Sequence, residues 1–228
     1  MYMRLVKNSS MAKILYGIQS DGMGHALRSK PIIDHLLSKG HKVKILSAER
    51  ALKFMKKHYK DVEEVQRFYF HYHNNSVSYP RTILHTIMES NGIIRKGILK
   101  VKEVIHKFKP DIVITDFESF SSRAAVLMGI PMISVDNITM LKLTRVPYTL
   151  FTYPFYFVSK LFIDFMINHA SYYFVTTFFE LPLKYKRHEN RVIFLPPILR
   201  KQIINVKKKA SYKNHILVYQ TSKTNKDL

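Results

Sequence analysis

Short apolar runs recur along the chain, and glycine, proline or polar residues bound each of them. Runs of this length without strict alternation are typical of strands buried on both faces of a parallel sheet. The pattern predicts strands at 12–18, 41–47, 65–70, 111–115 and 131–135, and a further one at 192–195.

The segments between these runs carry apolar residues at helical spacing. They predict helices at 26–38, 48–58, 80–107 (kinked near Gly92) and 119–128. Alternating strands and helices indicate an α/β fold, a Rossmann-like parallel sheet with helices on both faces. Ligands bind such sheets at the carboxyl ends of the strands. We therefore expect the functional residues in the loops 19–25, 116–120 and 136–138.

Residues 148–179 are rich in Phe and Tyr. Within 155–168, the polar residues Lys160, Asp164 and Asn168 repeat every four positions and form one stripe on an otherwise apolar helix. Two interpretations remain open: the helix packs on the sheet, or its aromatic face dips into a bilayer interface.

The predicted domain organisation has three parts. Residues 1–11 form an N-terminal extension without the apolar core of a signal peptide, and 12–195 form the Rossmann-like domain. Residues 196–228 comprise a linker that begins at Pro196-Pro197 and a first strand, 215–219, of an incomplete second domain. We expect that second domain to be truncated or encoded on a separate chain. No charge-free run is long enough for a membrane span, so a cytoplasmic location is expected.

Composition narrows the possible functions. Lys and Arg number 37 against 16 Asp and Glu, for a net charge of +21. Such a charge attracts polyanions, although a general compositional bias that spreads lysine over the surface explains it as well. The absence of cysteine excludes disulfides, zinc–thiolate sites and thiol chemistry. A basic region at 95–109 lacks a recognisable nucleic-acid-binding fold, so no specific nucleic acid partner is expected.

The segment 19–29 is the most informative part of the sequence. Gly22 and Gly24 lie where a strand turns into a helix, a position that offers free backbone N–H groups to an anion. A tight turn without any ligand is the simpler alternative. A dinucleotide fingerprint requires a third glycine where this chain has Leu27, although Glu49 could imitate its ribose-binding acid. His25 suits acid–base chemistry on a hydroxyl better. No metal-binding spacing, nucleophile elbow or phosphate-loop motif is present, so no metal is expected.

Gly22-Met23-Gly24-His25, followed by Arg28-Ser29, resembles the opening of GT-B glycosyltransferases. It is similar in style to the lipid II-forming N-acetylglucosaminyl transferase and related prokaryotic enzymes. Later segments continue the resemblance in order over about 12–219: they are Pro110-Asp111, Asp116, Gly129-Ile130-Pro131 and Asp136-Asn137.

The resemblance implies that this chain supplies the N-terminal, acceptor-binding half of the fold. His25 would be the catalytic base and Asp116 would orient it, with Glu118 as an alternative. The implied acceptor- or phosphate-binding residues are Gly22, Met23, Gly24, Arg28, Ser29, Glu118, Asp136 and Asn137.

The resemblance also implies transfer without a metal or other cofactor, from a nucleotide-sugar co-substrate that we expect to be a UDP-sugar. The expected partners are an acceptor, either lipid-linked or soluble, the anionic inner face of the cell membrane, and a chain that supplies the donor domain. Two other functions remain open: a nucleotide-cofactor Rossmann enzyme, and a non-catalytic membrane-associated subunit.

Overall fold

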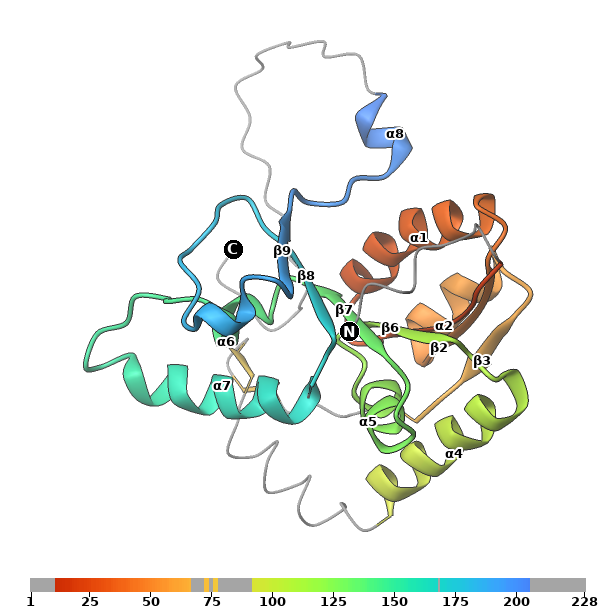
Figure 1. The fold of residues 1–228 in the computed structure, drawn as a ribbon, viewed down its shortest axis with the longest axis horizontal. Helices are drawn as coiled ribbons and strands as arrows, with labels where there is room; N and C mark the ends of the chain where they lie inside the picture. Colours follow the sequence, from red (N-terminus) through yellow and green to blue (C-terminus); the bar gives the residue numbers. More distant parts are fainter. Residues whose placement is uncertain (1–10, 67–71, 74–75, 78–91, 168, 206–228) are drawn as a thin grey trace.

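A computed structural model describes residues 11–66, 72–73, 76–77, 92–167 and 169–205 (Figure 1). A seven-stranded sheet runs through its centre in the order β3-β2-β1-β6-β7-β8-β9, and every pair of neighbours is parallel. The strands are β1 (Lys13–Ile18), β2 (Lys42–Ser47), β3 (Val62–Glu64), β6 (Ile112–Asp116), β7 (Met132–Asp136), β8 (Tyr172–Thr176) and β9 (Val192–Leu195). The predicted fold class is therefore confirmed.

Helices connect these strands and cover the sheet. They are α1 (Met23–Ser38), α2 (Glu49–Lys56), α4 (Ile93–Phe108), α5 (Ser119–Leu127), α6 (Met140–Leu143), α7 (Tyr153–Met166) and α8 (Lys201–Ile204), with a 3-10 turn η1 at Lys186–His188. A separate antiparallel pair joins β4 (Tyr72–His73) to β5 (Ser76–Val77). None of the helices in the described part of the chain is long and apolar enough to cross a bilayer.

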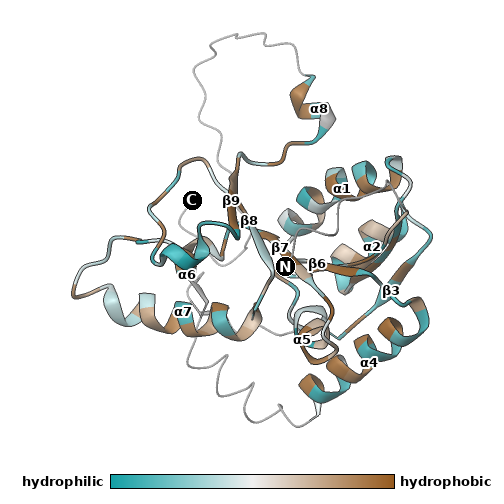
Figure 2. Cartoon of the chain, in the orientation of Figure 1, coloured by the Kyte–Doolittle hydropathy of each residue, from teal (hydrophilic) through white to brown (hydrophobic). Residues whose placement is uncertain are grey.

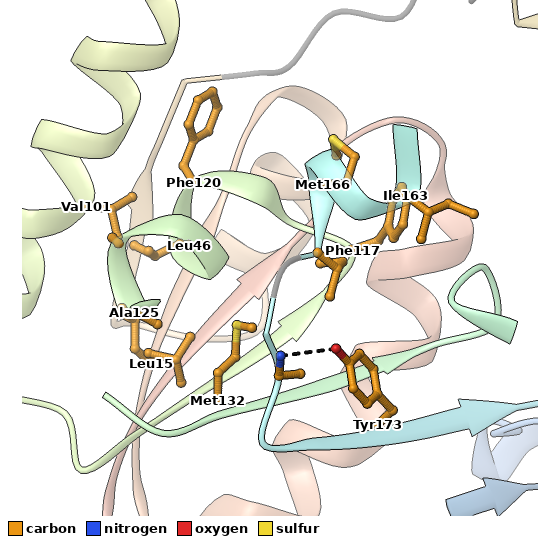
Figure 3. Packing of buried hydrophobic residues seen from close by; sticks show 14 of the residues in the cluster. Leu15, Leu46, Val101, Phe117, Phe120, Ala125, Met132, Ile163, Met166 and Tyr173 are labelled. Carbon is orange, nitrogen blue, oxygen red and sulfur yellow. Dashed lines mark hydrogen bonds between the residues drawn. The ribbon is translucent and has the colours of Figure 1, made fainter. Parts of the chain in front are cut away.

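Each face of the sheet buries its own apolar cluster, which explains the continuous apolar runs of the central strands. Along β1, Leu15 packs with one cluster, while its neighbours Ile14 and Tyr16 pack with the other. Residues of α4, α5 and α7 complete the Leu15 cluster, part of which appears in Figure 3. Residues of α1 and α2 complete the second cluster.

The strand order places the ligand-binding edge. From β1 the chain proceeds outward to β2 and β3, then returns to β6 on the other side of β1. Loops that leave the carboxyl ends of β1 and β6 therefore diverge to opposite sides, which opens a crevice where such folds bind ligands. Figure 1 shows α1 beginning beside these strand ends.

The predicted elements differ from the structure mainly at the edges of the sheet. The third strand is Val62–Glu64 rather than 65–70, of which 67–70 lie outside the described residues. Its sequence lacks an apolar run because this edge strand pairs with β2 alone, and the Glu63 carboxylate pairs with Lys44 and Lys100. The pattern also missed β8, since its Tyr and Phe residues stand in a region whose aromatic content obscured the strand signal.

Two helix boundaries also differ from the prediction. Helix α1 starts at Met23, three residues before the predicted start, so His25 lies in its first turn. Helix α4 begins at Ile93, and the earlier part of the predicted 80–107 helix falls largely outside the described residues. The predicted strand 215–219 and residues 1–10 of the predicted extension 1–11 also lie outside them.

We expect Gly97→Ala to destabilise the domain, although alanine normally stabilises a helix by about 1 kcal/mol relative to glycine. A Cβ at Gly97 would lie 2.7 Å from ring carbons of the buried Phe120, where α4 crosses α5. Overpacking of this kind costs about 1–3 kcal/mol, so the free energy of unfolding in urea should fall.

The neighbouring exposed substitution Lys96→Ala should change stability by less than about 0.5 kcal/mol. The double variant Gly97→Ala/Phe120→Leu should lose less free energy of unfolding than the sum of the losses in the two single variants, because the smaller Leu side chain makes room for the new Cβ. A stabilised Gly97→Ala protein would show that the helices do not meet this closely.

Candidate active site

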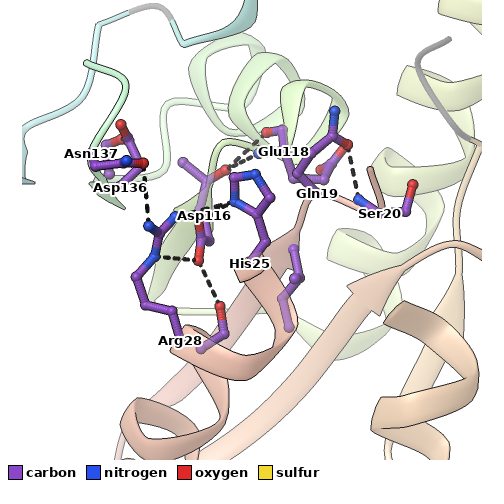
Figure 4. A network of polar contacts seen from close by, with 12 residues as sticks. Gln19, Ser20, His25, Arg28, Asp116, Glu118, Asp136 and Asn137 are labelled. Atoms are coloured by element: carbon purple, nitrogen blue, oxygen red, sulfur yellow. Dashed lines mark hydrogen bonds and ion pairs between the residues drawn. The ribbon is translucent and has the colours of Figure 1, made fainter. Parts of the chain in front are cut away.

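The predicted site residues converge where α1 begins beside the carboxyl ends of β6 and β7 (Figure 4). Asp116 is the last residue of β6, and Asn137 directly follows β7. His25 and Arg28 lie one turn apart on α1 and reach across to these strand ends. The parallel topology thus brings together residues separated by about 90–110 positions in the sequence.

The carboxylate of Asp116 is the centre of this network. It is fully buried and accepts hydrogen bonds from three residues of α1. The Nδ1 atom of His25 lies 2.7 Å from Oδ1, Arg28 Nε donates to Oδ2 over 3.1 Å, and Ser29 Oγ donates to Oδ2 over 2.9 Å. A second nitrogen of Arg28 also pairs with Oδ1.

These partners keep Asp116 ionised. Burial alone would raise the pKa of this carboxyl, but the charges of His25 and Arg28 and their hydrogen bonds outweigh burial and hold the pKa below its ordinary value. Burial would lower the guanidinium pKa of Arg28, but the charge and hydrogen bonds of Asp116, together with the charges of Asp136 and Tyr16, outweigh burial and raise it. The buried pair therefore persists as an ion pair.

Asp116 also fixes the tautomer of His25. A carboxylate only accepts, so Nδ1 carries the proton that points to Asp116, and Nε2 is left with its lone pair when the imidazole is neutral. The contact of 3.1 Å between Arg28 and the same Nδ1 is then a close approach between two donors. The ring is stacked on Phe117, with centroids 6.5 Å apart, and no described residue is hydrogen-bonded to Nε2.

The first backbone N–H groups of α1, which have no partner within the helix itself, lie in the same turn as His25. The cap residue of α1, Gly22, has φ of 85° and ψ of 161°, and no side chain caps the helix. Only glycine adopts this φ readily, so the backbone conformation by itself explains a glycine at position 22. A Cβ would meet no protein atom within 4 Å at either Gly22 or Gly24, and Gly24 does not have a positive φ. Both glycines are exposed, and Met23 between them packs against the α1 and α2 side of the core.

Arg28 extends the network to β7, because its Nη1 donates to Asn137 Oδ1 over 3.3 Å. Asn137 is exposed, so a ligand can reach the side chain to which the resemblance assigns an acceptor contact.

Asp136 and Glu118 are engaged within the protein. Asp136 is buried, accepts from Ser134 Oγ and from Thr139 N, and so shapes the loop after β7. Glu118 caps α5 by accepting from the N–H groups of Phe120 and Ser121 over 2.8 and 2.7 Å. Burial raises the pKa of both carboxyls. Their proposed contacts with acceptor or phosphate stay predictions, while their hydrogen bonds give each a structural role.

Gln19 is a site residue that the sequence pattern did not single out. It follows β1 directly, is buried, and donates its backbone N–H to the carbonyl of Asp116 over 3.1 Å. Its Oε1 accepts from Ser20 N, whereas its Nε2 has no hydrogen-bond partner within the described structure. An unpaired buried amide beside His25 is a candidate ligand contact. The sequence signal that could have identified Gln19 was its position as the first polar residue after the first strand.

A metal site is not found in the part of the chain that the structure describes, where no three His, Asp or Glu residues form a group able to hold an ion.

We expect Asp116→Asn to lower the free energy of unfolding by about 3 kcal/mol at pH 7, because it leaves the largely buried Arg28 without its counter-charge. The folded-state pKa of Asp116 is lowered, so its ionic contribution is present above the ordinary Asp pKa of about 3.9 and is lost as the pH falls toward the folded-state value.

The stability gap between wild type and variant should therefore narrow below about pH 4 in urea unfolding experiments. The matched change Asp61→Asn breaks an exposed pair with Lys44 and should cost less than about 1 kcal/mol. A gap that stays constant or widens at low pH would contradict the ion pair.

Comparisons with known proteins place this geometry in a family. Residues 12–228 match the sequence model of glycosyl transferase family 1. No curated protein matches the chain.

Several solved structures are similar in fold. The spinosyn forosaminyltransferase SpnP superposes with a TM-score of 0.50 at 10% identity, covering 83% of this chain and 51% of SpnP. Acinetobacter baumannii MurG gives a TM-score of 0.46 at 13% identity, covering 75% of this chain and 44% of MurG. The glycosyltransferase SsfS6 of Streptomyces sp. SF2575, complexed with thymidine diphosphate, gives 0.48 at 12% identity, covering 87% and 58%.

The chain spans about half the length of these solved proteins. The family model, by contrast, matches nearly all of this chain, from the first residue of the sheet domain onward. The chain belongs to glycosyl transferase family 1.

Proposed function

We propose that this chain supplies the acceptor-binding half of a glycosyltransferase that moves a sugar from a nucleotide-sugar, expected to be a UDP-sugar, onto an acceptor hydroxyl. The observation that carries this proposal is the His25–Asp116 contact at the uncapped start of α1. It combines a base of fixed tautomer with a site for negative charge, and family membership supplies the class of reaction.

In the proposed reaction His25 acts as the general base. Its Nε2 takes the proton of the acceptor hydroxyl as the oxygen bonds to the anomeric carbon of the sugar. The bond from that carbon to the diphosphate breaks, and its electron pair leaves with the nucleoside diphosphate. Asp116 acts through His25 by accepting from Nδ1 and stabilising the imidazolium that forms.

The first turn of α1 would contribute positive charge to the same step through the helix dipole. Arg28 donates hydrogen bonds to both Asp116 and Asn137. In this geometry it therefore fixes the position of Asp116 relative to the loop after β7. The backbone N–H groups at Gly22, Met23 and Gly24 can donate hydrogen bonds to the oxygens of a phosphate or diphosphate. Most of the donor nucleotide would be bound by a second domain.

His25→Ala should lower sugar transfer by roughly 10²–10⁴-fold, because it removes the proton acceptor without removing the anion site. Turnover is measured as labelled sugar transferred from UDP-sugars by the assembled enzyme. His35→Ala is the matched control, since this exposed histidine lies at the far end of the same helix. Near-normal turnover in His25→Ala would refute the assignment of the base.

A membrane-associated acceptor is the second part of the proposal. The segment before α7 and its N-terminal half form an aromatic patch, defined by exposed side chains that neighbour one another or lie on the same helix. They are Tyr148, Leu150, Phe151, Tyr153, Phe155, Phe157 and Leu161. Phe151 is 87% exposed and Phe155 70%, whereas Phe162, farther along α7, is only 8% exposed. Figure 2 shows the mixed hydropathy of this helix.

The burial of helix α7 therefore differs along its length. Its C-terminal half packs on the sheet through Phe162, Ile163 and Met166, as the core interpretation predicted. Its N-terminal half exposes aromatic rings in a protein of net charge +21, a combination that favours the interface of an anionic bilayer.

The double substitution Phe155→Ser/Phe157→Ser should weaken co-sedimentation with phosphatidylglycerol vesicles by about tenfold or more, because each buried ring contributes on the order of 1–3 kcal/mol. The protein should remain folded, since both side chains are already exposed. The control Val126→Ser/Leu127→Ser removes two exposed apolar side chains from α5 and should leave vesicle binding unchanged. A wild-type protein that never sediments with anionic vesicles would exclude the membrane role.

A further inference from the structure

A cavity of about 500 Å³ lies beside the beginning of β8, apart from the His25 site. Two of its lining residues, His169 and Ala170, precede β8, and Arg191 directly precedes β9. These positions are at the amino ends of the strands, whereas Asp116 and Asn137 lie at carboxyl ends. A cavity of this size accommodates a small organic ligand.

The charged side chains of this cavity are mostly basic. Lys142, Lys160, Arg187 and Arg191 line it together with a single carboxylate, that of Asp164. Asp164 pairs with Lys142 over 3.0 Å and with Lys160 over 3.7 Å, so its charge is already shared. Neither arginine forms an ion pair with an acidic side chain of the described structure. The cavity therefore has unneutralised positive charge.

The rings in the wall support binding of an anion. Arg187 lies over the Tyr185 ring at 4.8 Å and donates from Nε to His188 Nε2 over 3.4 Å. Because Nε2 accepts, the proton of a neutral His188 is on Nδ1, and this buried atom has no hydrogen-bond partner in the described part of the chain. Burial and the charges of Arg187, Lys142 and Arg191 lower the pKa of His188. A nearby anion would relieve the excess positive charge.

We propose that this basic pocket binds the phosphate group of a small phosphorylated ligand, at a second site separate from the proposed transfer chemistry. Arg187 and Arg191 supply planar guanidinium donors that match phosphate oxygens, and Lys142 and Lys160 add charge. Tyr173 and Tyr185 provide apolar surface for the organic part of the ligand. Either a soluble phosphate ester or a phospholipid headgroup carries this chemistry, and Lys160 joins the pocket to the helix that bears the aromatic patch.

Calorimetric titration of the 228-residue protein with inorganic phosphate and with glycerol 3-phosphate tests the pocket. Arg187→Ala/Arg191→Ala should lower both affinities at least tenfold. The control Lys186→Ala/Arg145→Ala removes the same charge from exposed residues outside the pocket and should stay within about twofold of wild type. Histidine NMR gives a second readout: the imidazole signals of His188 and His169 should move on titration with phosphate, while those of the exposed His35 should not.

Vesicles identify the source of the phosphate. If the arginine variant binds phosphatidylglycerol vesicles more weakly than wild type, and glycerol 3-phosphate displaces the wild-type protein from them, the pocket binds a lipid headgroup. If vesicle binding is unchanged while glycerol 3-phosphate binding is lost, it takes a soluble ester. The proposal is wrong if phosphate and its ester do not bind, or if the control variant loses as much affinity as the arginine variant.

Discussion

The buried carboxylate of Asp116 is the constraint that organises this molecule. A carboxylate with no exposed surface persists as an ion only if positive charge and hydrogen-bond donors surround it. Among the residues that the structure describes, its side-chain partners His25, Arg28 and Ser29 all come from the start of α1. The requirement to neutralise Asp116 thus fixes α1 against β6, and through Arg28 against the loop after β7. The same contacts that stabilise the fold hold the imidazole in position.

The parallel sheet separates two charged regions. Its carboxyl ends bring together the His25 network, and its amino ends at β8 and β9 carry the basic pocket. Both faces of the sheet are covered by apolar clusters, so polar chemistry is confined to the strand ends. The excess of basic residues behind the net charge of +21 is left unneutralised where acidic side chains are scarce. The basic pocket is such a place, because four basic side chains line it with one carboxylate, that of Asp164.

Helix α7 shows how one amphipathic segment divides its surface along its length. Phe162, Ile163 and Met166 anchor it to the core, while the aromatic residues nearer its start are exposed. The polar residues Lys160 and Asp164 reach the basic pocket. The helix therefore joins the core, the aromatic patch and the pocket, and the proposed membrane and phosphate contacts would use neighbouring parts of it.

The sequence by itself determined the fold class, most of the strands and the residues that meet at the site. Apolar runs buried on both sheet faces produce a strong local signal, and the right-handed parallel topology then forces the strand ends to one edge. Edge and boundary features escaped it: β3 needs no apolar run, β8 was obscured by aromatic neighbours, and the start of α1 depends on the φ of Gly22. Only the tertiary structure decided which role each of the three acidic residues at the strand ends has. Asp116 accepts from His25, while Glu118 caps α5 and Asp136 shapes a loop, because the surrounding donors, rather than residue type, set what each carboxylate can do.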